Sequence, residues 1–138
     1  MTRIVVDIKT WVFYLLTGDK SVARLLRLIT KNKVVNLLSK KLLDQLTEMV
    51  STSPVRLKVE PSLAKEFITL LIGKSKFIRP TSEIKRKVEK SDEEYVNMAI
   101  DGKSSYIITA EVGRFLKVDG YKKINVIELE SFLENFED

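Results

Sequence analysis

Apolar residues along the chain form two patterns that alternate from one end to the other. Short apolar runs, rich in β-branched residues, predict buried strands. These runs cover residues 4–6, 34–38, 105–109 and 124–127, and residues 76–80 indicate an edge or irregular strand. The segments between the runs have apolar residues three and four positions apart, which predicts helices.

The expected helices occupy residues 10–16, 21–32, 40–50, 61–73, 91–103 and 128–136, with a short helical turn at 112–116. The first of them is apolar on all sides, so we expect it to be buried. Ser21, Ser39 and Ser91 stand where N-caps are favoured. Residues 51–62 form a connection, and Pro61 suits the first turn of the next helix.

Strands separated by helices predict an α/β fold. We expect a three-layer α/β/α sandwich with a mainly parallel sheet of four or five strands, in one domain over residues 1–138. Many unrelated functions use such a sheet, so the fold alone does not assign one.

Composition limits the chemistry. The 138 residues include no cysteine and no histidine, which excludes disulfides, Cys/His zinc sites, cysteine nucleophiles and imidazole bases. The net charge of +5 is compatible with a polyanionic partner. No apolar stretch is long enough to cross a bilayer and the start lacks a signal-peptide pattern, so we expect a cytoplasmic location.

Three carboxylates stand where a parallel sheet brings side chains together. Asp7 ends the first strand, Asp92 begins the helix before the third strand, and Glu111 follows that strand. Such a cluster favours a divalent cation, Mg²⁺ or Mn²⁺, which activates water for attack on a phosphodiester. Simpler roles also exist, because Asp92 suits the first turn of a helix and Glu111 a solvated loop.

Four segments of the sequence form a recognisable set of motifs: RIVVDIKTWV, LSKKLLDQL, SDEEYVNMAIDGKSSYIITAE and INVIELESFLENF. Together they resemble the PIN-domain family, in particular its prokaryotic toxin–antitoxin ribonucleases. This resemblance implies a PIN-like fold and cleavage of single-stranded RNA with Mg²⁺ or Mn²⁺. It also implies an antitoxin protein as partner and a homodimer.

The resemblance also assigns roles to individual residues. Asp7 and Asp92 match the family's aspartates, Thr109 is retained, and Glu111 replaces an aspartate. Gln45 stands where the family has a glutamate, although Asp44 lies beside it. In the run DEE, Glu93 and Glu94 are alternatives to Asp92.

Lys9 stands where the family has an asparagine. Its ammonium group either enters the acidic cluster and neutralises it, or extends into solvent. We therefore carry two hypotheses: a weakly active metal-dependent ribonuclease using Asp7, Asp92, Glu111 and Gln45, and an inactive domain that binds RNA or protein.

Basic residues between the acidic motifs could follow a phosphate backbone. They are Lys31, Lys33, Lys40, Lys41, Arg79, Lys85, Arg86, Lys87 and Lys90. Trp11, Tyr14 and Leu15 share one helical face, which we interpret as a core or dimer contact, or as a platform for bases.

Overall fold

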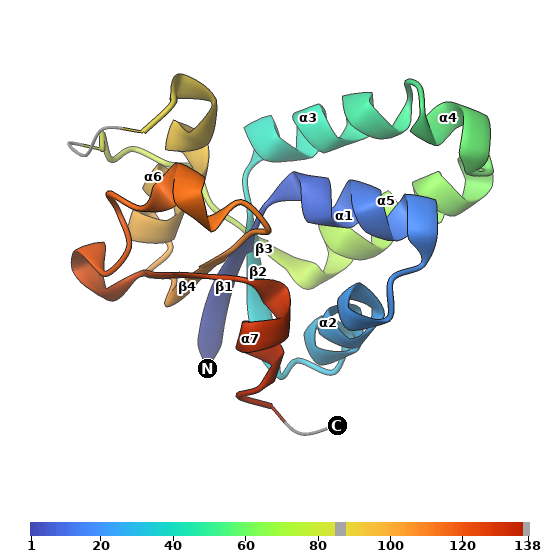
Figure 1. Ribbon diagram of the computed structural model, residues 1–138. Helices are drawn as coiled ribbons and strands as arrows, with labels where there is room; N and C mark the ends of the chain where they lie inside the picture. The colour runs from blue at the N-terminus through green and yellow to red at the C-terminus, as the bar shows by residue number, and fades with distance from the viewer. Residues whose placement is uncertain (85–87, 137–138) are drawn as a thin grey trace.

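A five-stranded parallel sheet forms the centre of the molecule (Figure 1). The computed structural model describes residues 1–84 and 88–136, so Lys85, Arg86 and Lys87 lie outside the described residues. The strand order is β3-β2-β1-β4-β5, and all four pairings are parallel. The strands are β1 (Thr2–Val6), β2 (Val34–Leu38), β3 (Ser75–Phe77), β4 (Tyr106–Ile108) and β5 (Asn125–Ile127). This confirms the predicted α/β fold.

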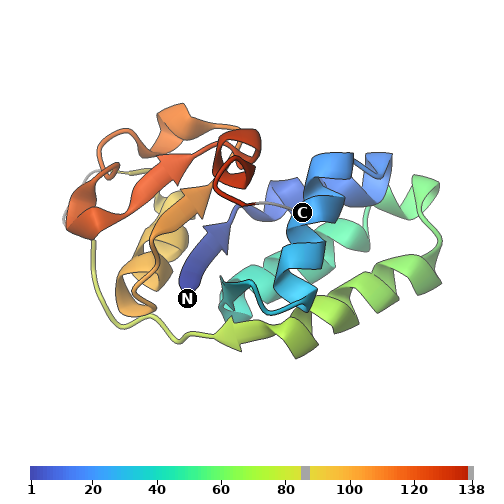
Figure 2. The ribbon, with the colours of Figure 1, turned by 90° about the horizontal axis from the view of Figure 1, so that it is seen from below.

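Helices cover both faces of the sheet. They are α1 (Ile8–Thr17), α2 (Lys20–Thr30), α3 (Lys40–Val50), α4 (Val55–Lys58), α5 (Pro61–Lys74), α6 (Glu93–Asp101) and α7 (Leu129–Leu133). The described residues also form three short 3₁₀ segments: η1 (Lys90–Asp92), η2 (Val112–Phe115) and η3 (Tyr121–Lys123). Figure 2 shows α6 on one face of the sheet, with α2 and α7 on the other. Among the described residues, we find no helix whose length and apolar character would allow it to span a membrane.

The central strand β1 is buried as its sequence predicts. Ile4 and Val5 are completely buried, and β1 pairs with β2 on one side and β4 on the other. Because all the strands run in one direction, the residues that follow β1, β2, β3 and β4 lie along one edge of the sheet. We call this the carboxyl edge.

The first helix differs from its prediction at both ends and in burial. It starts at Ile8, two residues early, because the Asp7 side chain caps it by accepting a hydrogen bond from the backbone N–H of Lys9. It is not buried all round: Trp11 is buried, whereas Phe13 is 51% exposed. Trp11 and Tyr14 both pack against the ring of Phe67 in α5, so this aromatic face belongs to the core. The homodimer stays a prediction.

Two other boundaries also differ. The connection predicted over 51–62 contains the short helix α4. Ser91 does not cap a helix, because the chain first forms η1 and α6 begins only at Glu93.

The C-terminal end of α6 lies very close to the sheet. At Gly102 an added Cβ atom would stand 2.4 Å from Cδ1 of Leu37 in β2 and 2.9 Å from the carbonyl oxygen of Met98. A larger residue at position 102 would therefore require the Leu37 side chain and the end of α6 to shift.

Candidate functional site

Asp7 lies at the carboxyl edge, where β1 ends and α1 begins. The residue is only 3% exposed. Its Oδ1 atom accepts hydrogen bonds from the Lys9 N–H (3.1 Å) and the Tyr95 hydroxyl (3.3 Å). Its Oδ2 atom accepts one from the Thr109 hydroxyl at 2.9 Å. The buried carboxylate is therefore compensated by several donors, as burial of a charge requires.

The other two predicted acids reach the same place from different elements. Asp92 ends η1 just before α6 and is 2% exposed. Glu111 follows β4, and its backbone N–H donates to the Thr109 hydroxyl oxygen at 3.0 Å. The Glu111 side chain is half exposed, so it forms the outer rim of the cluster.

Arg114, in η2, lies between all three acids. Its Nη1 atom is 2.8 Å from Oδ2 of Asp7 and 3.3 Å from Oε1 of Glu111. Its Nη2 and Nε atoms contact the two carboxylate oxygens of Asp92 at 2.5 and 3.2 Å. This forked contact is the strong, directional kind of ion pair that a guanidinium forms with a carboxylate. Arg114 is not among the site residues predicted from the sequence.

The environment of Arg114 keeps it charged. Its hydrogen bonds to Asp92 raise the pKa of the guanidinium above its ordinary value, burial acts against this, and the negative charge of Asp7 adds to the increase. Arg114 therefore carries its positive charge at neutral pH.

Lys9 contacts the cluster only at its exposed edge. Its Nζ atom is 3.2 Å from Oε1 of Glu111, and both side chains are largely in solvent. An extended backbone after β1 would place the side chains of Asp7 and Lys9 on the same side. The helix begins at Ile8 instead, and this directs the Lys9 side chain outward.

Tyr95 is a further member of the site. Its hydroxyl oxygen accepts a hydrogen bond from the N–H of Ile8 at 3.1 Å and its hydroxyl group donates to Asp7, while its ring meets Phe115 edge to face. Burial, together with the nearby charge of Asp7, raises the pKa of the phenol well above its ordinary value. Tyr95 therefore remains a neutral hydrogen-bond donor to Asp7.

The structure also separates the alternative acids. Asp92 faces the cluster, whereas Glu93 is exposed and Glu94 accepts a hydrogen bond from the Ser39 hydroxyl at 2.6 Å. Asp44 forms a surface ion pair with Lys40. Gln45 is half-buried and lines the same hollow as Asp7, Asp92 and Arg114, with a volume of about 540 Å³.

The site does not fit a divalent cation in this arrangement. Both oxygens of Asp7 already accept two hydrogen bonds each, and both oxygens of Asp92 are bound to Arg114. Within the described ranges, no group of three or more acidic, histidine or cysteine side chains is arranged to hold a metal. The oxygens that would bind an ion are those that the guanidinium occupies.

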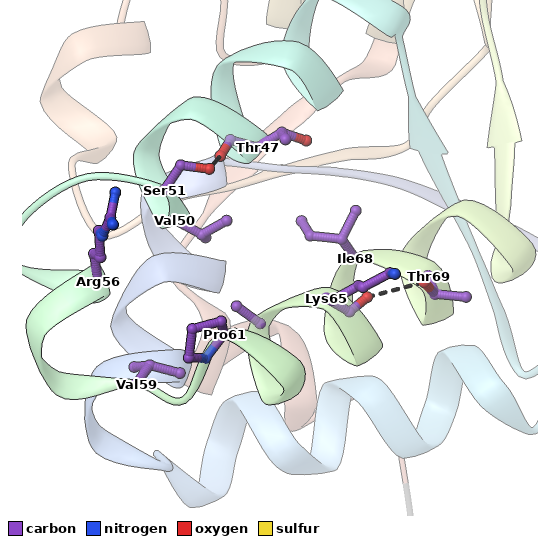
Figure 3. A pocket seen from close by; sticks show the side chains of 10 residues that line it. Thr47, Val50, Ser51, Arg56, Val59, Pro61, Lys65, Ile68 and Thr69 are labelled. Atoms are coloured by element: carbon purple, nitrogen blue, oxygen red, sulfur yellow. Dashed lines mark hydrogen bonds between the residues drawn. The ribbon is translucent and has the colours of Figure 1, made fainter.

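A second hollow of about 550 Å³ lies between α3, α4 and α5 (Figure 3). Val50, Val59 and Ile68 contribute its apolar lining, with Arg56 and Lys65 as its two cations. In the part of the chain described, it is lined by no carboxylate, so it offers none of the chemistry found at the carboxyl edge.

Comparison with known families gives one match. A model of the PIN domain matches residues 3–113. No curated protein matches the chain. The matched region contains Asp7, Asp92 and Glu111 and ends one residue before Arg114.

Proposed function

Because the chain belongs to the PIN domain family, whose members are typically nucleases, we propose that it binds single-stranded RNA at the carboxyl edge and does not cut it. One observation carries this proposal: the guanidinium of Arg114 forms ion pairs with Asp7, Asp92 and Glu111. These are the residues that would act as catalytic and metal-binding groups in the family's reaction.

Three further features support the loss of cleavage. Gln45 has no charge where the family has a glutamate, and a neutral amide oxygen binds a hard cation more weakly than a carboxylate does. The Glu111 side chain lies at the rim and is shared by Lys9 and Arg114. Asp7 serves as the cap of α1. The positive net charge supports binding to a polyanion.

A metal-dependent ribonuclease is the second candidate. It is favoured by the convergence of Asp7, Asp92 and Glu111 on a single group, since three acids from distant parts of the chain meet at Arg114. This function requires Arg114 to leave the cluster. Its side chain comes from a 3₁₀ segment of only four residues.

Calorimetric titration with Mn²⁺ distinguishes the two functions. We expect no binding heat from the native protein, because Arg114 holds the acids, and measurable binding after Arg114→Gln, which keeps a polar side chain and removes the charge. Arg56→Gln, on α4 at the second hollow, is the matched control and should behave as native. The double variant Asp7→Asn/Arg114→Gln should lose the gained binding.

A cleavage assay on labelled single-stranded RNA in Mn²⁺ completes the test. We expect the native protein to bind the RNA and leave it uncleaved. Tight Mn²⁺ binding by the native protein, with RNA cleavage that Asp7→Asn abolishes, would instead establish the ribonuclease.

A further inference from the structure

We propose that a basic hollow beside the acidic site binds one phosphate and one stacked base of single-stranded RNA. This inference rests on the proposed function and specifies where on the carboxyl edge the RNA binds. The hollow has a volume of about 560 Å³ and lies where β2 and β3 end. Its lining residues, which define the term basic hollow, are Ser39, Lys40, Lys41, Phe77, Ile78, Arg79, Pro80 and Glu94.

The aromatic side chain in the basic hollow is exposed. Phe77 ends the edge strand β3 and is 44% exposed, although its neighbour Leu38 on β2 is buried. The ring therefore contributes little to the core and presents a flat apolar surface at the wall of a hollow. Base stacking on exposed aromatic rings is the main sequence-independent contact in proteins that bind single strands.

Three cations share this hollow with one carboxylate. Among the residues that the structure describes, Lys41 and Arg79 form no ion pair, so their charges are available to a ligand. Lys40 pairs with Asp44 at 2.8 Å, but both side chains are strongly exposed, and such pairs are weak. The carboxylate of Glu94 is bound by the Ser39 hydroxyl. The excess of positive charge beside an aromatic ring fits a phosphate with its attached base.

The basic hollow lies close to the acidic site along the carboxyl edge. The strand order places β2 between β3 and β1, and a spacing of about 4.8 Å between strands separates their ends by about 10 Å. Asp92 lines the hollow that contains Asp7 and Arg114, and Glu94 lines the basic hollow. The start of α6 is therefore a wall common to both hollows. A single strand of RNA that crosses the start of α6 would therefore contact both hollows.

Fluorescence anisotropy with a labelled single-stranded oligouridylate, over a range of salt concentrations, tests the assignment. We expect Phe77→Ala to weaken binding about tenfold through loss of stacking, and Phe77→Tyr to restore it. Lys41→Ala/Arg79→Ala should reduce the slope of log affinity against log salt by about 0.7, since the hollow binds one phosphate and each phosphate contact to a single strand contributes about 0.7.

The helix α4 and the second hollow supply the matched controls. Leu57→Ala removes an exposed apolar side chain, and Arg56→Ala/Lys65→Ala removes two cations from a hollow of similar volume. All of these side chains are exposed, so thermal melting should show native stability in each variant. We expect the controls to bind RNA as the native protein does.

Two results would overturn the assignment, and they differ in what they imply. In the first, native protein binds RNA while the Phe77 and Lys41/Arg79 variants lower the affinity no more than the controls do. In that case RNA binds elsewhere on the protein, and the assignment to the basic hollow is wrong. If native protein shows no affinity for RNA, the proposed function fails together with the hollow.

Discussion

Arg114 forms ion pairs with all three acids of the site and so occupies carboxylate oxygens that could otherwise bind a metal. Its guanidinium is 20% exposed and is bound to two carboxylates that are almost completely buried. A buried ion pair adds little when compared with an apolar core, but removing only one partner leaves an uncompensated charge. The stability of the site therefore depends on Arg114 being present.

We expect Arg114→Met to lower the free energy of unfolding by about 3 kcal/mol, since the aspartates Asp7 and Asp92 lose their cation. Urea unfolding at neutral pH measures this loss. Lys9→Met is the control: it breaks only the exposed pair with Glu111 and should cost less than about 1 kcal/mol. Equal losses in the two variants would contradict the structural role of Arg114.

The acidic residues of this site could be predicted from sequence, but their cation could not. Asp7 and Asp92 directly follow or precede recognisable elements, so the topology brings them together. Arg114 lies in the sequence VGRFL, which has no motif of its own. The available signal was its spacing, because residue i+3 on a helical turn lies on the same side as Glu111. Lys9 was a candidate because it is close to Asp7 in sequence. The helix that Asp7 caps directs the Lys9 side chain toward solvent instead.

At the scale of elements, α6 ends with a negatively charged residue, which is unfavourable at the C-terminal end of a helix. Asp101 is its last residue, and the negative end of a helix dipole disfavours a carboxylate there. Hydrogen bonds from the connecting segment compensate: Asp101 accepts from the N–H groups of Thr81 (2.6 Å) and Ser82 (2.9 Å) and from the Ser82 hydroxyl. Asp101 thus attaches Thr81 and Ser82, in the connection that follows β3, to the end of α6.

We expect Asp101→Asn to lower the free energy of unfolding at pH 7 by about 1 kcal/mol, as hydrogen bonds to an ionised acceptor are stronger than those to an amide but solvent screens this carboxylate. Burial acts to raise the pKa of Asp101, but the hydrogen bonds from Ser82 and Thr81 outweigh it and hold the pKa below its ordinary value of 3.8. Because the folded state favours the ionised form, this contribution is complete at neutral pH. It is lost as the pH falls below about 3.8 and through the lower pKa of the folded protein.

Unfolding measured in urea at several acidic pH values checks this prediction. The difference between native protein and Asp101→Asn should shrink as the pH falls. Asp44→Asn, which removes an exposed carboxylate paired only with Lys40, serves as the control and should change little at any pH. A constant difference for Asp101→Asn across the acidic range would contradict the assigned hydrogen bonds.

Elements with a strong local signal were predicted well, and those shaped by tertiary contacts were not. The strand β2 and the helix α3 have the predicted bounds, because a β-branched run, the cap at Ser39 and one apolar stripe all agree. The start of α6 was misplaced because the 3₁₀ segment η1 brings Asp92 to Arg114 instead of leaving Ser91 to cap a helix. A long-range ion pair of this kind has no local pattern.

At the scale of the whole molecule, the residues after the family match complete the structure. They include β5, which adds the last strand to the sheet, and α7, which packs against α2. Phe132 of α7 is completely buried, with its ring edge to face with Tyr106 at 5.1 Å between centroids. The two ends of the chain are therefore joined through one core.

We expect Phe132→Ala to lower the free energy of unfolding by about 4 kcal/mol, through lost burial and the cavity that remains. The unfolding curve should keep a single transition by circular dichroism and tryptophan fluorescence, since Trp11 and Phe132 belong to the same core. Leu116→Ala, at an exposed apolar position, is the control and should be neutral. Two separate transitions in Phe132→Ala would contradict a common core.

The ion pairs of Arg114 also bear on how such a chain evolves. In a nuclease, selection for catalysis keeps the aspartates. Here Asp7 caps a helix and, with Asp92, compensates a partly buried guanidinium, so replacing either would endanger folding itself. Under the proposed binding function, selection for a folded protein alone is sufficient to retain both acids, so their presence is not by itself a sign of cleavage.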